Sequence, residues 1–242
     1  MKYLCDPHVI PTVVPRDLDH LLSYAAFVAT FSDSLHVDID DGQFAPSTTW
    51  PLSDPQQLAE LDTLSLPPQL AYEAHLMTAN PADLGVRFAH AGFSRIVMHR
   101  EPFGTPAEAR AALDECRAAG AREAGLALLL ETPLSLLEEV APACDFVHLL
   151  SVARIGEQGQ PFDESTLSRV EELHALYPDL MVSIDGGVTE ATVEQLVRAG
   201  ANRLAVGAAI STSEDPASAF ARIHERAMRG CAPISGEVAA IA

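Results

Sequence analysis

Residues 35–46 read L-H-V-D-I-D-D-G-Q-F-A-P. Three polar residues in this segment that could carry chemistry, His36, Asp38 and Asp40, alternate with apolar residues. The alternation of apolar and polar residues predicts a β-strand, in which these three side chains point to the same side. An unpaired buried charge costs several kcal/mol, so an imidazole and two carboxylates on one face indicate either a functional site or a solvated edge strand. The Asp-Gly pair at 41–42 ends the strand as a turn. We therefore favour a metal site or a proton-transfer site at the carboxyl end of this strand.

Histidine and aspartate also occur where other predicted strands end. His75 lies at the end of the third predicted strand and Asp185 at the end of the seventh. Two imidazoles and two carboxylates from different strands suit a divalent transition metal, although each residue alone is more often a hydrogen-bonded core residue. The candidate set is His36, Asp38, His75 and Asp185.

Two glycine-containing turns follow the last two predicted strands. The sequence D-G-G occupies residues 185–187, and V-G-A-A-I occupies residues 206–210. In barrels of alternating strands and helices, the loops after strands seven and eight bind phosphate through backbone N–H groups. We therefore predict a phosphate site at Gly186, Gly187, Gly207 and Ala208.

These residues must be positioned by a repeating architecture, because apolar runs alternate with helical patterns eight times along the chain. Nearly continuous apolar strands indicate a parallel sheet that is covered on all sides, and eight such repeats in this length predict a single (β/α)₈ barrel. We assign the barrel to residues 1–229 and a C-terminal tail to residues 230–242. The predicted strands are 8–14, 35–40, 70–76, 93–99, 123–129, 144–151, 180–184 and 202–206. The predicted helices are 17–31, a short one from 54, 81–90, 106–120, a short one from 133, 163–177, 189–200 and 215–229.

Composition excludes several functions. The 242 residues carry a net charge of −19, which disfavours nucleic acid and anionic membranes as partners. No apolar run approaches the ~18 residues of a membrane span, and the N-terminus lacks the apolar core of a signal peptide, so we expect a cytoplasmic protein. Four well-separated cysteines predict reduced thiols rather than disulfides or a zinc knuckle. The only lysine, Lys2, precedes the first strand, which argues against Schiff-base chemistry.

Several motifs resemble those of the ribulose-phosphate 3-epimerase family. H-V-D-I-D-D-G-Q-F-A-P resembles that family's H-x-D-x-M-D-G-x-F-V-P. Five further segments resemble family motifs in the same order: A-H-L-M followed by N-P, M-H-R-E, the segment from S-V to G-E-Q-G-Q-P-F, I-D-G-G-V and V-G-A-A-I. The resemblance covers nearly the whole chain, from residue 7 to about residue 227.

This resemblance implies an epimerase that interconverts D-ribulose 5-phosphate and D-xylulose 5-phosphate, and that forms a homo-oligomer. Asp38 and Asp185 would be the acid/base catalysts on opposite faces of the substrate. The same two carboxylates would join His36 and His75 in holding one divalent metal ion, with zinc first and iron, manganese or cobalt as alternatives. Substrate and phosphate would contact Thr12, His75, Met77, Gly159, Gly186, Gly187, Gly207 and Ala208.

Departures from the family pattern leave alternatives open. Asp40 and Leu150 each stand where the family has a methionine, and the loop after the sixth strand carries Ala153-Arg154-Ile155 where the family has Asn-Pro. We hypothesise that Asp40 and Arg154 pair above the site. Such changes favour another ketose phosphate, such as a ketohexose 6-phosphate, as the alternative substrate. A non-catalytic barrel that binds sugar phosphates is a further alternative, whereas the related decarboxylases need a D-x-K-x-x-D strand that is absent here.

Overall fold

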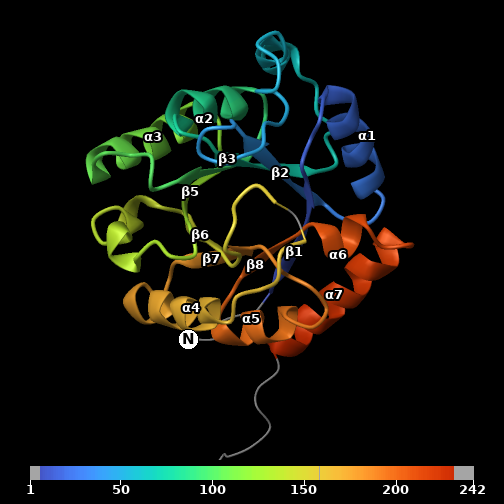
Figure 1. The fold of residues 1–242 in the computed structure, drawn as a ribbon, viewed down its shortest axis with the longest axis vertical. Helices are drawn as coiled ribbons and strands as arrows, with labels where there is room; N and C mark the ends of the chain where they lie inside the picture. Colours follow the sequence, from blue (N-terminus) through green and yellow to red (C-terminus); the bar gives the residue numbers. More distant parts are fainter. Residues whose placement is uncertain (1–5, 158, 232–242) are drawn as a thin grey trace, which may run out of the picture.

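The structure, a computed structural model, describes residues 6–157 and 159–231, and its eight parallel strands close into a barrel in the order β1 to β8 (Figure 1). The predicted (β/α)₈ barrel is therefore confirmed. Most predicted strands differ from the observed ones by one or two residues at either end. The strands are β1 His8–Val13, β2 Ser34–Asp40, β3 Ala71–Met77, β4 Arg95–His99, β5 Glu123–Leu128, β6 Phe146–Leu150, β7 Met181–Asp185 and β8 Arg203–Val206.

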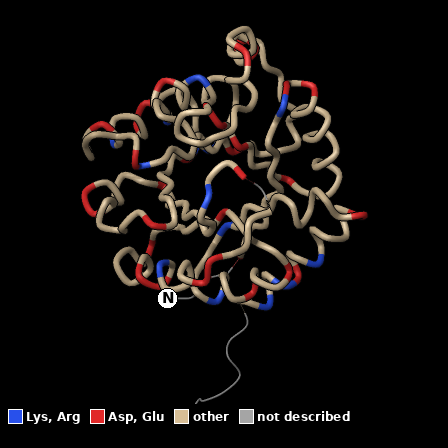
Figure 2. The backbone as a smooth tube through the Cα atoms, viewed as in Figure 1, with Lys and Arg blue, Asp and Glu red and all other residues tan. Residues whose placement is uncertain are grey.

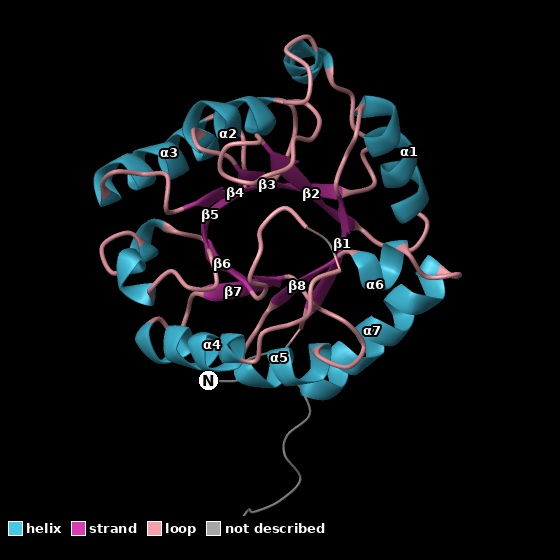
Figure 3. Cartoon of the chain, viewed as in Figure 1, coloured by secondary structure: helices cyan, strands magenta, loops and turns pink. Residues whose placement is uncertain are grey.

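The helices form a ring outside the strands (Figure 3). The short helices predicted after the second and fifth strands are 3₁₀ helices, a form that proteins use in short pieces. A four-residue helix after β8, α6, was not predicted because its sequence is too short for a periodic pattern. The α-helices are α1 Leu18–Val28, α2 Pro81–His90, α3 Pro106–Ala118, α4 Ser165–Leu176, α5 Val193–Ala199, α6 Ala208–Ser211 and α7 Pro216–Gly230. The 3₁₀ helices are η1 Gln57–Thr63, η2 Leu134–Leu137 and η3 Ala141–Ala143.

Local sequence explains where these helices begin and end. Thr105 and Glu108 form a reciprocal capping box at the start of α3, and Pro106 occupies the first helical position. Gly200 ends α5 in the left-handed conformation, with φ of 117°. Capping residues and a glycine in the sequence therefore account for these two helix ends.

The two faces of the barrel wall differ in chemistry. Apolar side chains such as Val37, Ile39 and Leu76 belong to the main hydrophobic core. The alternate positions of the same strands carry fully buried polar groups, among them His36 and Glu73. Burial of charged groups is costly unless they are paired. The interior of the barrel must therefore contain an organised polar network.

The cysteine prediction is wrong at one position. Cys116 and Cys144 are free thiols, but Cys231 is disulfide-bonded. Spacing excluded only disulfides between neighbouring cysteines, because tertiary packing brings distant residues together. Cys5 and residues 232–242 of the predicted tail lie outside the described residues.

Acidic side chains are spread over the outer helices and loops, in keeping with the negative net charge (Figure 2). Among the described residues, no helix is long and apolar enough to cross a membrane.

Candidate active site

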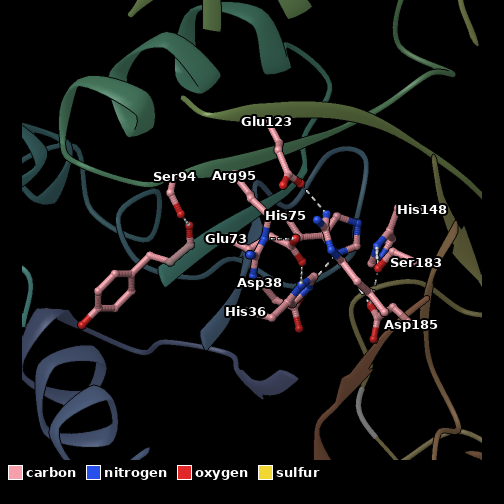
Figure 4. A network of polar contacts seen from close by, with 12 residues as sticks. His36, Asp38, Glu73, His75, Ser94, Arg95, Glu123, His148, Ser183 and Asp185 are labelled. Atoms are coloured by element: carbon pink, nitrogen blue, oxygen red, sulfur yellow. Dashed lines mark hydrogen bonds and ion pairs between the residues drawn. The ribbon is translucent and has the colours of Figure 1, made fainter. Parts of the chain in front are cut away.

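Three of the four predicted metal ligands are in direct contact inside the barrel, and the fourth lies beside them (Figure 4). Asp38 Oδ1 lies 3.0 Å from His36 Nε2 and 3.0 Å from His75 Nδ1. Asp185 Oδ2 lies 3.6 Å from His75 Nδ1. The parallel register explains part of this arrangement, since Asp38 on β2 is the direct neighbour of His75 on β3.

A buried carboxylate orients the first of these histidines. Glu73 Oε1 lies 2.5 Å from His36 Nδ1, and Arg95 Nε donates to Glu73 Oε2 at 2.9 Å. A proton on Nδ1 directed at Glu73 leaves His36 Nε2 facing Asp38. Such a carboxylate partner fixes the tautomer of a metal-binding histidine. Glu73 was not predicted from the sequence, although its place two residues before His75 puts it on the same face of β3.

A second chain of contacts orients His75. His75 Nε2 lies 3.1 Å from His99 Nε2, and His99 Nδ1 lies 3.2 Å from Glu101 Oε2. Glu101 also accepts from the backbone N–H of Leu129 and from the hydroxyl of Thr132. With the His99 proton on Nδ1, His99 Nε2 accepts from His75 Nε2–H. A metal ion bound at His75 Nδ1 would require this tautomer, whereas in the opposite tautomer His75 Nδ1–H donates to Asp38 Oδ1.

The protonation states of this cluster follow from burial and from neighbouring charges. Burial favours a neutral Asp38, but His36 and His75 outweigh it and hold the Asp38 pKa well below its usual value. Burial lowers the pKa of His75 to about 4, so its imidazole is neutral at pH 7. Burial also opposes a charge on His36, but Asp38 and Glu73 outweigh it and raise the His36 pKa. Asp38 and His75 therefore already have the protonation states that metal ligands require.

The donor atoms fit a divalent metal ion in chemistry and in spacing. Two ligands bound to one tetrahedral zinc ion at about 2.0–2.1 Å lie roughly 3.3 Å apart. Three of the six donor pairs have separations of 3.0, 3.0 and 3.6 Å, which fall on either side of that value. Mixed imidazole and carboxylate donors suit zinc and iron. The chemistry and spacing of these three pairs are compatible with a shared divalent metal ion, and the four-residue ligand set stays a prediction.

A fifth residue, His148 on β6, joins the cluster and was not expected from the sequence. Candidate donor atoms of His36, His75, His148 and Asp185 all lie within 4.8 Å of one another. His148 is fully buried. It is flanked by apolar residues in the run F-V-H-L-L, which gives no alternating signal of a polar face.

A cavity of about 330 Å³ opens above this cluster at the carboxyl ends of the strands. The fully buried His36 and His75 are not among the residues that line it. The predicted site residues that do line it are Thr12, Asp38, Asp40, Met77, Arg154, Gly159, Asp185, Gly186, Gly187, Gly207 and Ala208.

The glycine turn after β7 requires its sequence. Gly186 and Gly187 both have positive φ, at 104° and 61°. A Cβ on Gly187 would lie 2.5 Å from the backbone of Phe162, and one on Gly186 would lie 2.6 Å from Val152. Only glycine therefore fits at these two positions, where the turn after β7 packs closely against the loop after β6.

The loop after β6 crosses the open end of the barrel and contacts the loop after β2 (Figure 3). The Ser47 hydroxyl is hydrogen-bonded to Asp40 Oδ2 and lies 3.2 Å from the carbonyl oxygen of Gly156. Burial raises the pKa of Asp40 to about 7. Asp40 Oδ1 is buried and has no hydrogen-bond partner among the described residues. Asp40 therefore lines the cavity with one of its two carboxyl oxygens unpaired among the described residues.

The hypothesised pair between Asp40 and Arg154 is not found. The Arg154 guanidinium lies 3.3 Å from Glu157 and 3.4 Å from Gln160, both in its own loop. These neighbours are closer along the chain, and the Arg154 side chain remains 68% exposed. Asp40 instead takes Ser47 as its partner.

Comparison with known proteins gives consistent matches. The pattern of the ribulose-phosphate 3-epimerase family matches residues 8–211. The "Ribulose-phosphate 3-epimerase" of Mycobacterium leprae is 31% identical over 225 residues, which covers 91% of this chain and 95% of that protein. The protein of the same name from Synechocystis sp. is 30% identical and covers 89% of this chain and 92% of its own length.

Solved structures with the same fold include other sugar-phosphate enzymes. A 3-hexulose-6-phosphate synthase matches with a TM-score of 0.67 and 20% identity, and covers 90% of this chain and 99% of its own. The 3-keto-L-gulonate-6-phosphate decarboxylase of Vibrio cholerae matches with a TM-score of 0.69 and 14% identity, and covers 93% of this chain and 98% of its own. At these identities the likeness extends to the fold alone.

Proposed function

Because the chain belongs to the ribulose-phosphate 3-epimerase family and is an isomerase, we propose that it interconverts D-ribulose 5-phosphate and D-xylulose 5-phosphate by moving a proton at C3. The observation that carries the proposal is a pair of carboxylates, Asp38 on β2 and Asp185 on β7. Both line one cavity, and both approach the same imidazole, that of His75.

Epimerisation at a carbon beside a ketone needs a base on one face and an acid on the other. One of the two carboxylates, in its ionised form, removes the C3 proton and leaves an enediolate. The other carboxylate, in its protonated form, delivers a proton to the opposite face of C3. In the reverse reaction the two exchange roles, so the number of protons in the site is unchanged.

His36, Asp38, His75 and Asp185 would hold a divalent metal ion, with zinc as the first choice on the grounds of donor chemistry. A bound metal ion would supply positive charge that lowers the energy of the enediolate. Glu73 and His99 contact the outer ring nitrogens of His36 and His75, and so orient these imidazoles with their other nitrogens towards the carboxylates. The loop after β6 helps to exclude water from the cavity, since it spans the opening and contacts the loop after β2.

The phosphate of the substrate would bind at Gly186, Gly187, Gly207 and Ala208, all of which line the cavity. Backbone N–H groups at such turns hold phosphate without a cationic side chain. This suits the cavity, because Arg154 is the only basic residue among its described lining residues and is already paired with Glu157.

Two buried polar atoms without partners support a hydroxylated ligand. Thr12 and Asp40 line the cavity, and Thr12 Oγ1 and Asp40 Oδ1 are buried without a hydrogen bond to any described residue. Each such atom costs about 1–3 kcal/mol when left unpaired. Sugar hydroxyl groups would satisfy both.

Asp40 is also the observation that favours a second candidate. A carboxyl group at the cavity, where the family has a methionine, can bind an additional hydroxyl group of a longer sugar. Another ketose phosphate, such as a ketohexose 6-phosphate, is therefore the alternative substrate.

The decisive test follows D-ribulose 5-phosphate and a small panel of ketose phosphates by NMR in D₂O, with zinc-, manganese- and iron-loaded protein. Deuterium should enter at C3 as xylulose 5-phosphate accumulates. A different preferred sugar would favour the alternative substrate. If no loaded form exchanges C3 of any sugar, the epimerase proposal is wrong.

A further inference from the structure

His148 has a nitrogen atom that the contacts of the described residues leave unexplained. Its side chain is fully buried, and its Nδ1 lies 3.0 Å from the hydroxyl of Ser183, its register neighbour on β7. Its Nε2 has no hydrogen-bond partner among the described residues. Asp185 Oδ2 lies 3.9 Å from it, which is beyond hydrogen-bond distance. A buried polar atom left in this state costs about 1–3 kcal/mol.

His148 is held in the same manner as the two predicted histidine ligands. In His36 and His75, one ring nitrogen contacts an outer partner, Glu73 or His99, and the other faces the carboxylates. In His148, Ser183 takes the part of the outer partner. The free nitrogen of His148 therefore corresponds to the metal-facing nitrogen of each of the other two.

The three rings also lie side by side (Figure 4). The His148 ring centroid lies 4.7 Å from that of His75 and 5.4 Å from that of His36. Donor atoms from all three rings and from Asp185 fall within 4.8 Å of one another.

We infer that His148 Nε2 is a direct ligand of the divalent metal ion, so that the site contains three imidazoles. This inference rests on the metal site of the proposed function, but it assigns a ligand that the predicted set of two histidines and two aspartates does not contain. An imidazole adds a donor without adding negative charge to a site that is already rich in carboxylates.

A third imidazole also changes which metals the site prefers. Imidazole suits zinc, iron and nickel, whereas carboxylate and water suit magnesium and manganese. The wild-type protein should therefore favour Zn²⁺ and Co²⁺ over Mn²⁺, and loss of His148 should narrow that preference.

The variant His148→Leu removes the imidazole donor and replaces it with an apolar side chain that suits the apolar strand β6. Its matched control is Phe146→Leu, because Phe146 is a fully buried residue two positions earlier on the same strand and carries no donor. Metal-free protein is titrated with Zn²⁺, Co²⁺ and Mn²⁺ against a chromophoric chelator, after circular dichroism has established that each variant is folded.

His148→Leu should weaken Zn²⁺ binding by at least about 10–100-fold, because even the loss of an outer partner of a metal ligand has an effect of this size. The visible absorption of the Co²⁺ form should change as well, since it reports the coordination of the metal. Phe146→Leu should leave both the affinity and the spectrum unchanged. Wild-type affinity and an unaltered Co²⁺ spectrum in folded His148→Leu would overturn the inference.

X-ray absorption of the zinc-loaded wild-type protein tests the same inference without any variant. Three imidazoles per zinc ion are expected. Two imidazoles would overturn the role of His148 and leave the predicted metal site intact. A wild-type protein that binds none of the three metals would overturn both.

Discussion

Replacement of Glu73 by glutamine tests whether the buried polar network holds the site together. The Glu73 side chain is fully buried between His36 Nδ1 at 2.5 Å and Arg95 Nε at 2.9 Å. Glutamine keeps the shape but has one carbonyl oxygen for two donors. Its NH₂ group must then face either the imidazole N–H or the guanidinium. Arg95, whose side chain is only 13% exposed, also loses its counter-ion.

The expected effects are large in two measurements. Removal of one partner of a buried ion pair costs about 3–5 kcal/mol, because the other charge stays buried and unpaired. Loss of the carboxylate that orients His36 should weaken metal binding by about 10–100-fold. Urea unfolding of the metal-free protein measures the first effect, and chelator competition with Zn²⁺ measures the second.

The matched control is Glu194→Gln. Glu194 pairs with Arg198 at 2.6 Å on the surface of α5, where the arginine side chain is 58% exposed. The same substitution there should change the free energy of unfolding by no more than about 0.5 kcal/mol. If Glu73→Gln also unfolds within that range and binds Zn²⁺ like the wild type, the assignment of Glu73 as the organiser of His36 is refuted.

Three further outcomes are expected. Asp38→Asn and Asp185→Asn should each lower turnover in the NMR assay by at least about 10²–10⁴-fold while the fold survives; near wild-type turnover in either would contradict the two-carboxylate mechanism. Asp40→Met removes the unpaired carboxylate oxygen of the cavity and should raise the kcat/KM ratio of ribulose 5-phosphate to ketohexose 6-phosphates, whereas an unchanged ratio would make Asp40 a bystander. Burial opposes a charge on Glu101, but contacts with His99 and the loop after β5 lower the Glu101 pKa to about 2. Ionised Glu101 therefore contributes its full stabilisation of the folded protein above about pH 4.5, and this contribution is lost as the pH falls towards 2. Glu101→Gln should therefore unfold more easily than the wild type at pH 7 by roughly 3 kcal/mol and by much less at pH 3 in urea titrations; an equal difference at both pH values would exclude an ionised Glu101 as the source.

Much of the fold and part of the site could be predicted because their signals are local. Apolar runs and helix caps such as the Thr105–Glu108 box place the elements along the chain. In a barrel of parallel strands, the carboxyl ends of the strands must meet at one rim. The convergence of Asp38 and Asp185 could therefore be expected without knowledge of which strands pair in which register.

Glu73 and His148 could not be recognised because their significance depends on register and on the depth of the barrel. Glu73 becomes a partner of His36 because β2 and β3 place these two residues side by side. His148 reaches the cluster across the interior of the barrel, from a strand whose sequence is apolar on both sides of it. Arg154 shows the opposite error, since its charge suggested a partner in the site but was already matched within its own loop.

The balance of charge links the stability of the interior to its chemistry. The buried polar network contains four carboxyl groups, those of Asp38, Glu73, Glu101 and Asp185. Among the described residues, Arg95 is the only arginine that forms an ion pair with any of them. Because these carboxyl groups are buried, their negative charges need compensation, and one arginine does not supply enough positive charge. Asp38 and Glu73 raise the His36 pKa despite burial, so a proton on that ring can supply part of the missing charge. A divalent metal ion would supply more, but it requires the same nitrogen in its neutral form. A proton and a metal ion would therefore compete for His36 Nε2, and two of the four carboxylates that create this demand, Asp38 and Asp185, are those proposed to carry out the epimerisation.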